Sequence, residues 1–256
     1  MKKELVAFDR ILYILDELRE KCPWDRKQTM ESLRNLTVEE TYELADAIIN
    51  KDMPEIKKEL GDLLLHIVFY AKIAEEQHKF TITEVINSVC EKLVSRHPHV
   101  FADTEVKDHK EVEKNWEQIK MTEGYKSILS GVPDSLPALI KSNRIQQKVR
   151  GVGFDWDEKG QIWDKIHEEL DELQKEVKDN DKEKTEAEFG DLLFSIINAA
   201  RLYDIDPENA LEKTNKKFIK RFKYLEKETI NKGQSLKDMN LEEMNAIWEE
   251  AKKEDE

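Results

Sequence analysis

Two sets of acidic residues recur along the chain with the same spacing, and carboxylates are side chains that hold metal ions or transfer protons. In each set, a Glu-Glu-x-x-Glu segment is followed after fifteen residues by Glu-x-Gly-Asp-Leu-Leu. The offset between the sets is 129 residues at each acidic position. At this acidic content, five such matches arise by chance in roughly 5 of 10,000 registers. The first set comprises Glu39, Glu40, Glu43, Glu59 and Asp62, and the second comprises Glu168, Glu169, Glu172, Glu188 and Asp191.

The spacing within each set favours a helical hairpin that brings the carboxylates together. Residues three or four apart share a helix face, so Glu40 lies with Glu43 and Glu59 with Asp62. The connector near residues 50–54 is short enough for an antiparallel pair of helices, as is its counterpart in the second copy. Converging carboxylates repel one another unless cations bind, and oxygen-only ligands suit Mg²⁺ that bridges to substrate phosphates.

A glycine stands directly before the same aspartate in both copies, as Gly61 and Gly190. A glycine within a helix costs about 1 kcal/mol relative to alanine, so its repetition predicts close helix packing or close approach of a ligand. The alternative interpretation of the acids is a solvated helix face, which is common at this charge density. The repeat and its glycine favour a binding site over that alternative.

Basic and aromatic residues follow the second acidic set. Lys217 and Arg221 are four residues apart on one predicted helix face, a geometry suited to holding phosphate groups. The alternative is a surface face paired with acids such as Glu226. Trp248 could stack on a nucleobase, or it could fill the packing of the last helix.

The composition limits the classes of function. The chain carries 56 acidic and 42 basic residues, for a net charge of −14, so duplex nucleic acid is not an expected partner. There is no Gly-x-x-x-x-Gly-Lys segment, which excludes a P-loop nucleotide site. The longest apolar run, residues 63–71, falls short of the roughly 20 residues that span a bilayer, so no membrane partner is expected. With only Cys22 and Cys90 and no evident signal peptide, we expect a cytoplasmic protein.

Apolar residues recur with the 3.6-residue period of helices, and alternating strand patterns are short and rare. We therefore predict an all-α fold. The segment from Lys126 to Pro137 contains a glycine and two prolines, which break helices. The predicted organisation is an N-terminal helical module at residues 1–125, a linker at 126–140 and a C-terminal module at 141–256.

Taken together, these residues resemble the MazG family of nucleoside triphosphate pyrophosphohydrolases, in the all-α NTP pyrophosphatase superfamily. The tandem acidic motifs carry the resemblance, which covers essentially the whole chain. Three further segments are similar to those of the family: Cys22-Pro23-Trp24-Asp25, Ser95-Arg96-His97-Pro98-His99-Val100-Phe101 and Gly151-Val152-Gly153-Phe154-Asp155-Trp156.

The resemblance implies two tandem four-helix modules, a homodimer, and Mg²⁺-dependent conversion of nucleoside triphosphates to monophosphates and pyrophosphate, by attack of a metal-activated water on phosphorus. Mn²⁺ is the implied substitute ion. The implied metal ligands in the second module are Glu169, Glu172, Glu188 and Asp191, with Glu168 as a further catalytic residue and Glu39, Glu40, Glu43, Glu59 and Asp62 as first-module counterparts. The implied substrate contacts are Lys184, Lys217 and Arg221 to the triphosphate or ribose, and Trp248 near the nucleoside.

We expect the second module to carry most of the activity. Lys184 precedes Glu188 by one helical turn, whereas the matching first-module position is Glu55. An anion there would repel the substrate phosphates, unless Lys57 or Lys58 supplies the missing charge. The alternative function is a non-enzymatic helical protein that binds nucleotide or Mg²⁺ in a regulatory or scaffolding role.

Overall fold

The computed structural model describes residues 2–102, 104, 106–108, 111–112, 115–116, 119, 127–231 and 233–253. Throughout these residues every regular element is a helix, which confirms the all-α prediction. The chain divides into two compact units, Met1–Val112 and Glu113–Glu256, each of which is described by itself. The predicted start of the linker, residue 126, lies outside the described residues, and the predicted module boundaries remain predictions.

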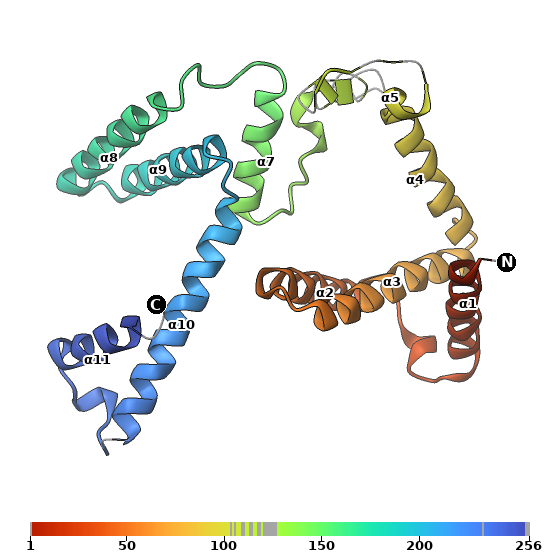
Figure 1. Ribbon diagram of the computed structural model, residues 1–256, viewed down its shortest axis with the longest axis horizontal. Helices are drawn as coiled ribbons and strands as arrows, with labels where there is room; N and C mark the ends of the chain where they lie inside the picture. Colours follow the sequence, from red (N-terminus) through yellow and green to blue (C-terminus); the bar gives the residue numbers. More distant parts are fainter. Residues whose placement is uncertain are drawn as a thin grey trace. The chain divides into compact units, whose positions relative to one another are not determined.

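The first unit is built on a hairpin of two long helices, α2 and α3, that lie side by side (Figure 1). Helix α1 packs against α3, and its Leu15 joins Leu33, Val68, Phe69 and Ile73 in the core. The core therefore lies along the later half of α3, which leaves the earlier half available for polar side chains. The helices of this unit are α1 (Lys3–Lys21), the 3₁₀ turn η1 (Asp25–Lys27), α2 (Met30–Asn50), α3 (Met53–Glu76), α4 (Ile82–Arg96) and α5 (Pro98–Phe101).

The second unit repeats the hairpin with α8 and α9, whose long axes also run side by side (Figure 1). Helices α7 and α10 contact α9, and α11 packs on α10. Buried Ile162, Ala199 and Leu202 form the core near the start of α8 and the end of α9. The helices of this unit are η2 (Ile128–Gly131), α7 (Ala138–Arg150), α8 (Gln161–Asp179), α9 (Lys182–Leu202), α10 (Pro207–Asn231), η3 (Leu236–Asp238) and α11 (Leu241–Lys253).

The two hairpins turn in the same way. The first helix ends at a residue in the left-handed region, Lys51 or Asn180, each with φ 56°. The next residue is an aspartate, Asp52 or Asp181, whose side chain accepts a hydrogen bond from the backbone N–H three residues further on. This N-cap satisfies a backbone donor that the helix leaves unpaired, so it fixes where the second arm begins. The register that brings acids of the two arms together is set at these turns.

A buried ion pair ties the loop before α8 to the end of α9. Arg201 is 7% exposed, and its Nη1 donates to Asp155 Oδ2 at 3.1 Å while its Nη2 donates to the other carboxylate oxygen. Asn198 accepts further hydrogen bonds from the same guanidinium, at 2.7 and 3.1 Å. The pair anchors the entry to α8 at the end of the hairpin away from the acidic motif.

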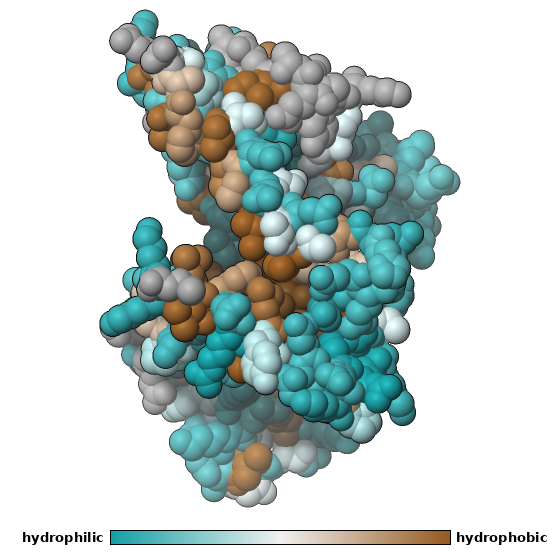
Figure 2. Space-filling model, turned by 90° about the vertical axis from the view of Figure 1, so that its right-hand side faces the viewer, coloured by the Kyte–Doolittle hydropathy of each residue, from teal (hydrophilic) through white to brown (hydrophobic). Residues whose placement is uncertain are grey.

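Large apolar side chains also remain exposed, and brown patches are visible on the face displayed in Figure 2. Exposed apolar residues of the first unit have exposed apolar counterparts 129 residues later in the second unit. Within the described residues, no helix is long and apolar enough to cross a membrane. The repeated exposed face carries Leu60, Leu64 and Ile67 on α3 and Phe189, Leu193 and Ile196 on α9.

Candidate metal centres

The α2–α3 hairpin brings three glutamates together, Glu40 and Glu43 from α2 and Glu59 from α3. Each offers a carboxylate oxygen, and these oxygens lie within 4.8 Å of one another. Glu43 is exposed, Glu40 is half-buried, and Glu59 is completely buried. We call these three residues the first cluster.

The α8–α9 hairpin forms the matching set from Glu169 and Glu172 of α8 and Glu188 of α9, again with oxygens within 4.8 Å of one another. We call these residues the second cluster. Here the buried member is Glu169, at 6% exposure, while Glu188 is half-buried and Glu172 is exposed. The motif therefore recurs in space as well as in sequence, but the most buried carboxylate comes from a different arm in each hairpin.

The charges within each cluster perturb one another. Burial and the nearby carboxylates of Glu59, Asp62 and Glu43 raise the pKa of Glu40 above its usual range. Burial, followed by the charge of Glu172 and of other acids including Asp191, raises the pKa of Glu188. Without a bound cation, burial and mutual repulsion therefore disfavour the ionised form of the carboxylates in both clusters.

The remaining members of the acidic motifs lie around these clusters. Asp62 and Asp191 act on Glu40 and Glu188 through their charge, but they fall outside the sets whose oxygens lie within 4.8 Å. Glu39 and Glu168 are exposed, and Glu168 pairs with Lys165 at 3.0 Å. The structure thus brings together three of the carboxylates in each predicted ligand set.

A lysine contacts the most buried carboxylate of each cluster. In the first, Lys58 Nζ lies 2.8 Å from Glu59 Oε1 and 2.7 Å from Glu55 Oε1. The hydrogen bond from Lys58 lowers the pKa of Glu59 despite its burial. In the second, Lys165 Nζ lies 2.8 Å from Glu169 Oε1. Sequence reasoning missed Lys165, although its place four residues before Glu169 is a recognisable helical ion-pair spacing.

A divalent cation fits the chemistry of both clusters. All the donors are carboxylate oxygens, which hard cations such as Mg²⁺ prefer. Glu59 Oε2 is buried and has no hydrogen-bond partner among the described residues, a costly arrangement that a cation would relieve. The donors present therefore suit the ion that the sequence predicted.

The predicted substrate-binding residues lie on several elements. Lys184 is on the first turn of α9, where its Nζ is 3.3 Å from Asp181 and 3.8 Å from Glu176. Lys217 and Arg221 are on α10, and Trp248 is on α11. The Trp248 ring packs against Phe218 with 4.9 Å between ring centroids. Only Lys184 belongs to the hairpin that carries the second cluster.

The prediction of close helix packing at the repeated glycines is wrong within this chain. A Cβ atom added at Gly61 or Gly190 would meet no other heavy atom within 4 Å in the described part of the structure. Both glycines lie on the exposed side of their hairpin, beside the acidic cluster. The space beside each glycine is therefore open to a group from outside the hairpin. The alternative prediction, close approach of a ligand, stays a prediction.

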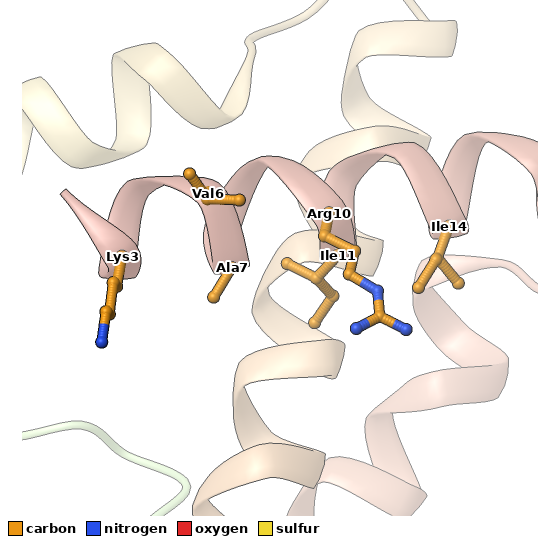
Figure 3. Close-up of a pocket in the computed structure, with 6 residues that line it drawn as sticks. All are labelled: Lys3, Val6, Ala7, Arg10, Ile11 and Ile14. Carbon is orange, nitrogen blue, oxygen red and sulfur yellow. The ribbon is translucent and has the colours of Figure 1, made fainter. Parts of the chain in front are cut away.

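A hollow along α1 is unrelated to either cluster (Figure 3). Its lining is apolar and basic, without a carboxylate, so it offers no ligand for a hard cation. The residues that line it are Lys3, Val6, Ala7, Arg10, Ile11 and Ile14.

Comparison with known proteins connects this geometry to a family. The model of the MazG nucleotide pyrophosphohydrolase domain matches residues 28–101 and 159–225, stretches that contain both clusters. The nucleoside triphosphate pyrophosphohydrolase of Escherichia coli (strain K12) is 41% identical, over 96% of this chain and 97% of its own length. The nucleoside triphosphate pyrophosphohydrolase/pyrophosphatase MazG of Thermotoga maritima is 44% identical over the whole of both chains. The crystal structure of a mazG-related protein from Thermotoga maritima matches 44% of this chain and 98% of its own, with 29% identity and a TM-score of 0.40.

Proposed function

We propose the function of this chain from one premise: it belongs to the MazG nucleotide pyrophosphohydrolase family. On that premise it is a hydrolase of phosphorus-containing anhydrides, which converts a nucleoside triphosphate and water to a nucleoside monophosphate and pyrophosphate. The observation that carries the proposal is the second cluster, three glutamates with oxygens within 4.8 Å of one another on the hairpin that the family model covers.

We propose that the reaction depends on Mg²⁺, with Mn²⁺ as a substitute. Glu169, Glu172 and Glu188 would hold the ion, with Asp191 close enough to add its charge. When bound, the ion supplies activation of water and neutralisation of the triphosphate.

The basic residues of the second unit complete the proposed site. Lys184 stands one helical turn before Glu188 and is 65% exposed along its side chain, so its ammonium is free to reach a phosphate from its present contacts. Lys217 and Arg221 on α10 would hold the triphosphate or ribose, and Trp248 would lie near the nucleoside. Glu168, exposed beside the cluster, would be a further catalytic residue, and one of the glutamates would orient or deprotonate the water.

We propose that the chain works as a homodimer. The apolar residues on the outer faces of α3 and α9 remain exposed in one copy, and such patches usually mark an interface. Static light scattering should give about twice the chain mass of 30.2 kDa. A monomer at all concentrations would contradict this assembly.

The products of hydrolysis test the activity. Incubation with ATP and Mg²⁺ should release AMP and pyrophosphate, and EDTA should stop the release. ADP and orthophosphate as main products would mean that a different bond is cut. Absence of hydrolysis with any of the common nucleoside triphosphates, at either Mg²⁺ or Mn²⁺, would favour the non-enzymatic alternative.

A further inference from the structure

A lysine outside the repeated acidic motif contacts each cluster, and in both cases its partner is the carboxylate with the least exposure. We propose that Lys58 and Lys165 are internal counter-cations, which neutralise Glu59 and Glu169 in the metal-free chain and leave these carboxylates when a divalent ion binds. The inference rests on the proposed function in one respect, that the clusters bind a divalent ion.

The contact in the second cluster involves a carboxylate that the metal would need. Lys165 Nζ bridges Glu169 Oε1 at 2.8 Å and Glu168 Oε1 at 3.0 Å. The Glu169 side chain is only 8% exposed, so water does little to screen its charge. Because Glu169 is also one of the three residues whose oxygens converge, the ammonium and a divalent ion compete for the same negative charge.

The first cluster has the same arrangement in a more buried form. The Glu59 side chain has no exposed surface, and Lys58 meets it through one oxygen only. The second oxygen, Oε2, is buried without a hydrogen-bond partner among the described residues. Lys58 therefore offsets the charge of Glu59 but does not satisfy the carboxylate, which is the behaviour expected of a stand-in for a better-fitting cation.

The two lysines do not occupy equivalent positions. At the offset of 129, the counterpart of Lys58 is Ala187, and the counterpart of Lys165 is Leu36. The glutamates repeat between the hairpins, yet the lysines reach the buried carboxylate from α3 in one and from α8 in the other. Because the lysine–glutamate contact occurs in both hairpins but from different sequence positions, it reflects an electrostatic requirement of the cluster and not simple duplication of the sequence.

An ordinary surface ion pair is the competing explanation, since pairs between exposed side chains contribute little. Burial separates the two explanations. The pair of Lys252 with Glu249 joins two substantially exposed side chains, whereas Glu59 and Glu169 are withdrawn from water. Glu176, which is also buried, likewise has lysines beside it, Lys175 at 3.5 Å and Lys184 at 3.8 Å. A lysine beside a withdrawn carboxylate contributes more because the charge it neutralises is poorly solvated.

Binding of Mn²⁺ without nucleotide, followed by the electron paramagnetic resonance of the free ion, tests the inference on the full chain. The second cluster is measured with Glu43→Gln present to weaken the first, and the first is measured with Glu172→Gln present. Lys165→Met should tighten Mn²⁺ binding by about threefold to tenfold. Lys178→Met removes an exposed cation from the same helix and should change the affinity by less than about twofold.

The first cluster has an equally close control. Lys58→Met should tighten Mn²⁺ binding there, whereas Lys57→Met, one residue away on the same helix and exposed, should have the smaller effect. Replacing Lys165 by arginine keeps the charge and should leave the affinity near that of the parent. A melting curve in EDTA confirms that each variant folds, and Lys165→Met should melt lower than Lys178→Met because its carboxylates are left uncompensated.

The outcomes separate the inference from the proposed function. If the parent chain binds Mn²⁺, but Lys165→Met and Lys58→Met bind it no more tightly than their controls Lys178→Met and Lys57→Met, the counter-cation role is wrong and the proposed metal sites are unaffected. If the parent chain binds no Mn²⁺ at either cluster, the proposed metal dependence itself fails.

Discussion

Replacing one glutamate in each cluster by glutamine should separate catalysis from folding. Glu172 and Glu43 occupy the same position in the two hairpins, are both exposed, and each contribute an oxygen to their cluster. We expect both substitutions to stabilise the metal-free chain to a similar extent. We expect only Glu172→Gln to remove most of the pyrophosphate release, because the second unit also carries Lys184 and Trp248.

The size of the effect follows from the spacing of the oxygens. Two unit charges separated by the 4.8 Å limit of the cluster repel by roughly 3.5 kcal/mol at an effective dielectric constant of about 20. Water and salt reach an exposed glutamate, so we retain about a quarter of this, or about 1 kcal/mol. For a chain of this length that corresponds to a rise of about 2–4 °C in Tm. The same glutamate attracts a divalent ion, which carries twice the charge of a second carboxylate. Losing this attraction should therefore cost about 2 kcal/mol, which corresponds to about a thirtyfold loss in rate or metal affinity.

Two measurements on the same samples check this reasoning. Melting curves by circular dichroism in EDTA report the relief of repulsion, and pyrophosphate release from ATP with Mg²⁺ reports catalysis. Addition of Mg²⁺ should raise the Tm of the parent chain more than that of either variant. Destabilisation by both substitutions in EDTA would show that the carboxylates do not repel as calculated. Equal losses of activity, or a larger loss from Glu43→Gln, would refute the assignment of catalysis to the second unit.

Three further substitutions test separate features. Gly190→Ala should raise the Tm of the metal-free chain, since helix propensity gains about 1 kcal/mol and the added Cβ meets open space, yet it should slow ATP hydrolysis if a ligand approaches there; unchanged steady-state kinetics would argue against that approach. Arg201→Met should lower the free energy of unfolding in urea by about 2 kcal/mol, because it leaves the partly buried Asp155 carboxylate with only the longer ion pair to Arg150, at 3.6 Å; an unchanged urea midpoint would contradict the anchoring role. Because the pKa of Glu188 is raised in the folded chain, that residue favours folding at low pH and loses this contribution as the pH rises through its folded pKa. Glu188→Gln should therefore stabilise the chain in EDTA at pH 7.5, and its advantage in Tm should shrink towards pH 5; an advantage that grows on acidification would contradict the direction of the shift.

Much of the fold was predictable because its signals are local. The apolar period indicates the helices, and the aspartates at Asp52 and Asp181 mark where the second arms begin. The convergence of Glu40 with Glu43 follows from helical spacing, and that of either with Glu59 follows from the short connector. Local signals did not indicate which α3 acid joins the α2 acids: Glu59 belongs to the set whose oxygens lie within 4.8 Å of one another, whereas Asp62, on the same helix face, does not.

The repeated glycines show where sequence reasoning fails for a physical reason. A glycine within a helix indicates that something approaches closely, but the spacing does not identify what approaches. The structure excludes the hairpin's own helices at Gly61 and Gly190, which a single sequence could not do. Burial was likewise out of reach, because the same motif buries Glu59 in one hairpin and Glu169 in the other.

This difference in burial explains how two nearly identical motifs acquire different electrostatics. The carboxylate that is withdrawn from water needs the nearest compensating charge, and that charge must come from whichever turn faces it. In the first hairpin Lys58, the neighbour of Glu59, provides it, and Glu55 shares the ammonium. In the second, Lys165 provides it from one turn earlier, and Lys184 lies instead beside Asp181 at the start of α9 and beside the buried Glu176 of α8. Lys165 compensates Glu169, and Lys175 lies closer to Glu176 than Lys184 does, at 3.5 Å against 3.8 Å. Lys184 can therefore turn to a phosphate, and this is the physical basis for expecting the second hairpin to be the better catalyst.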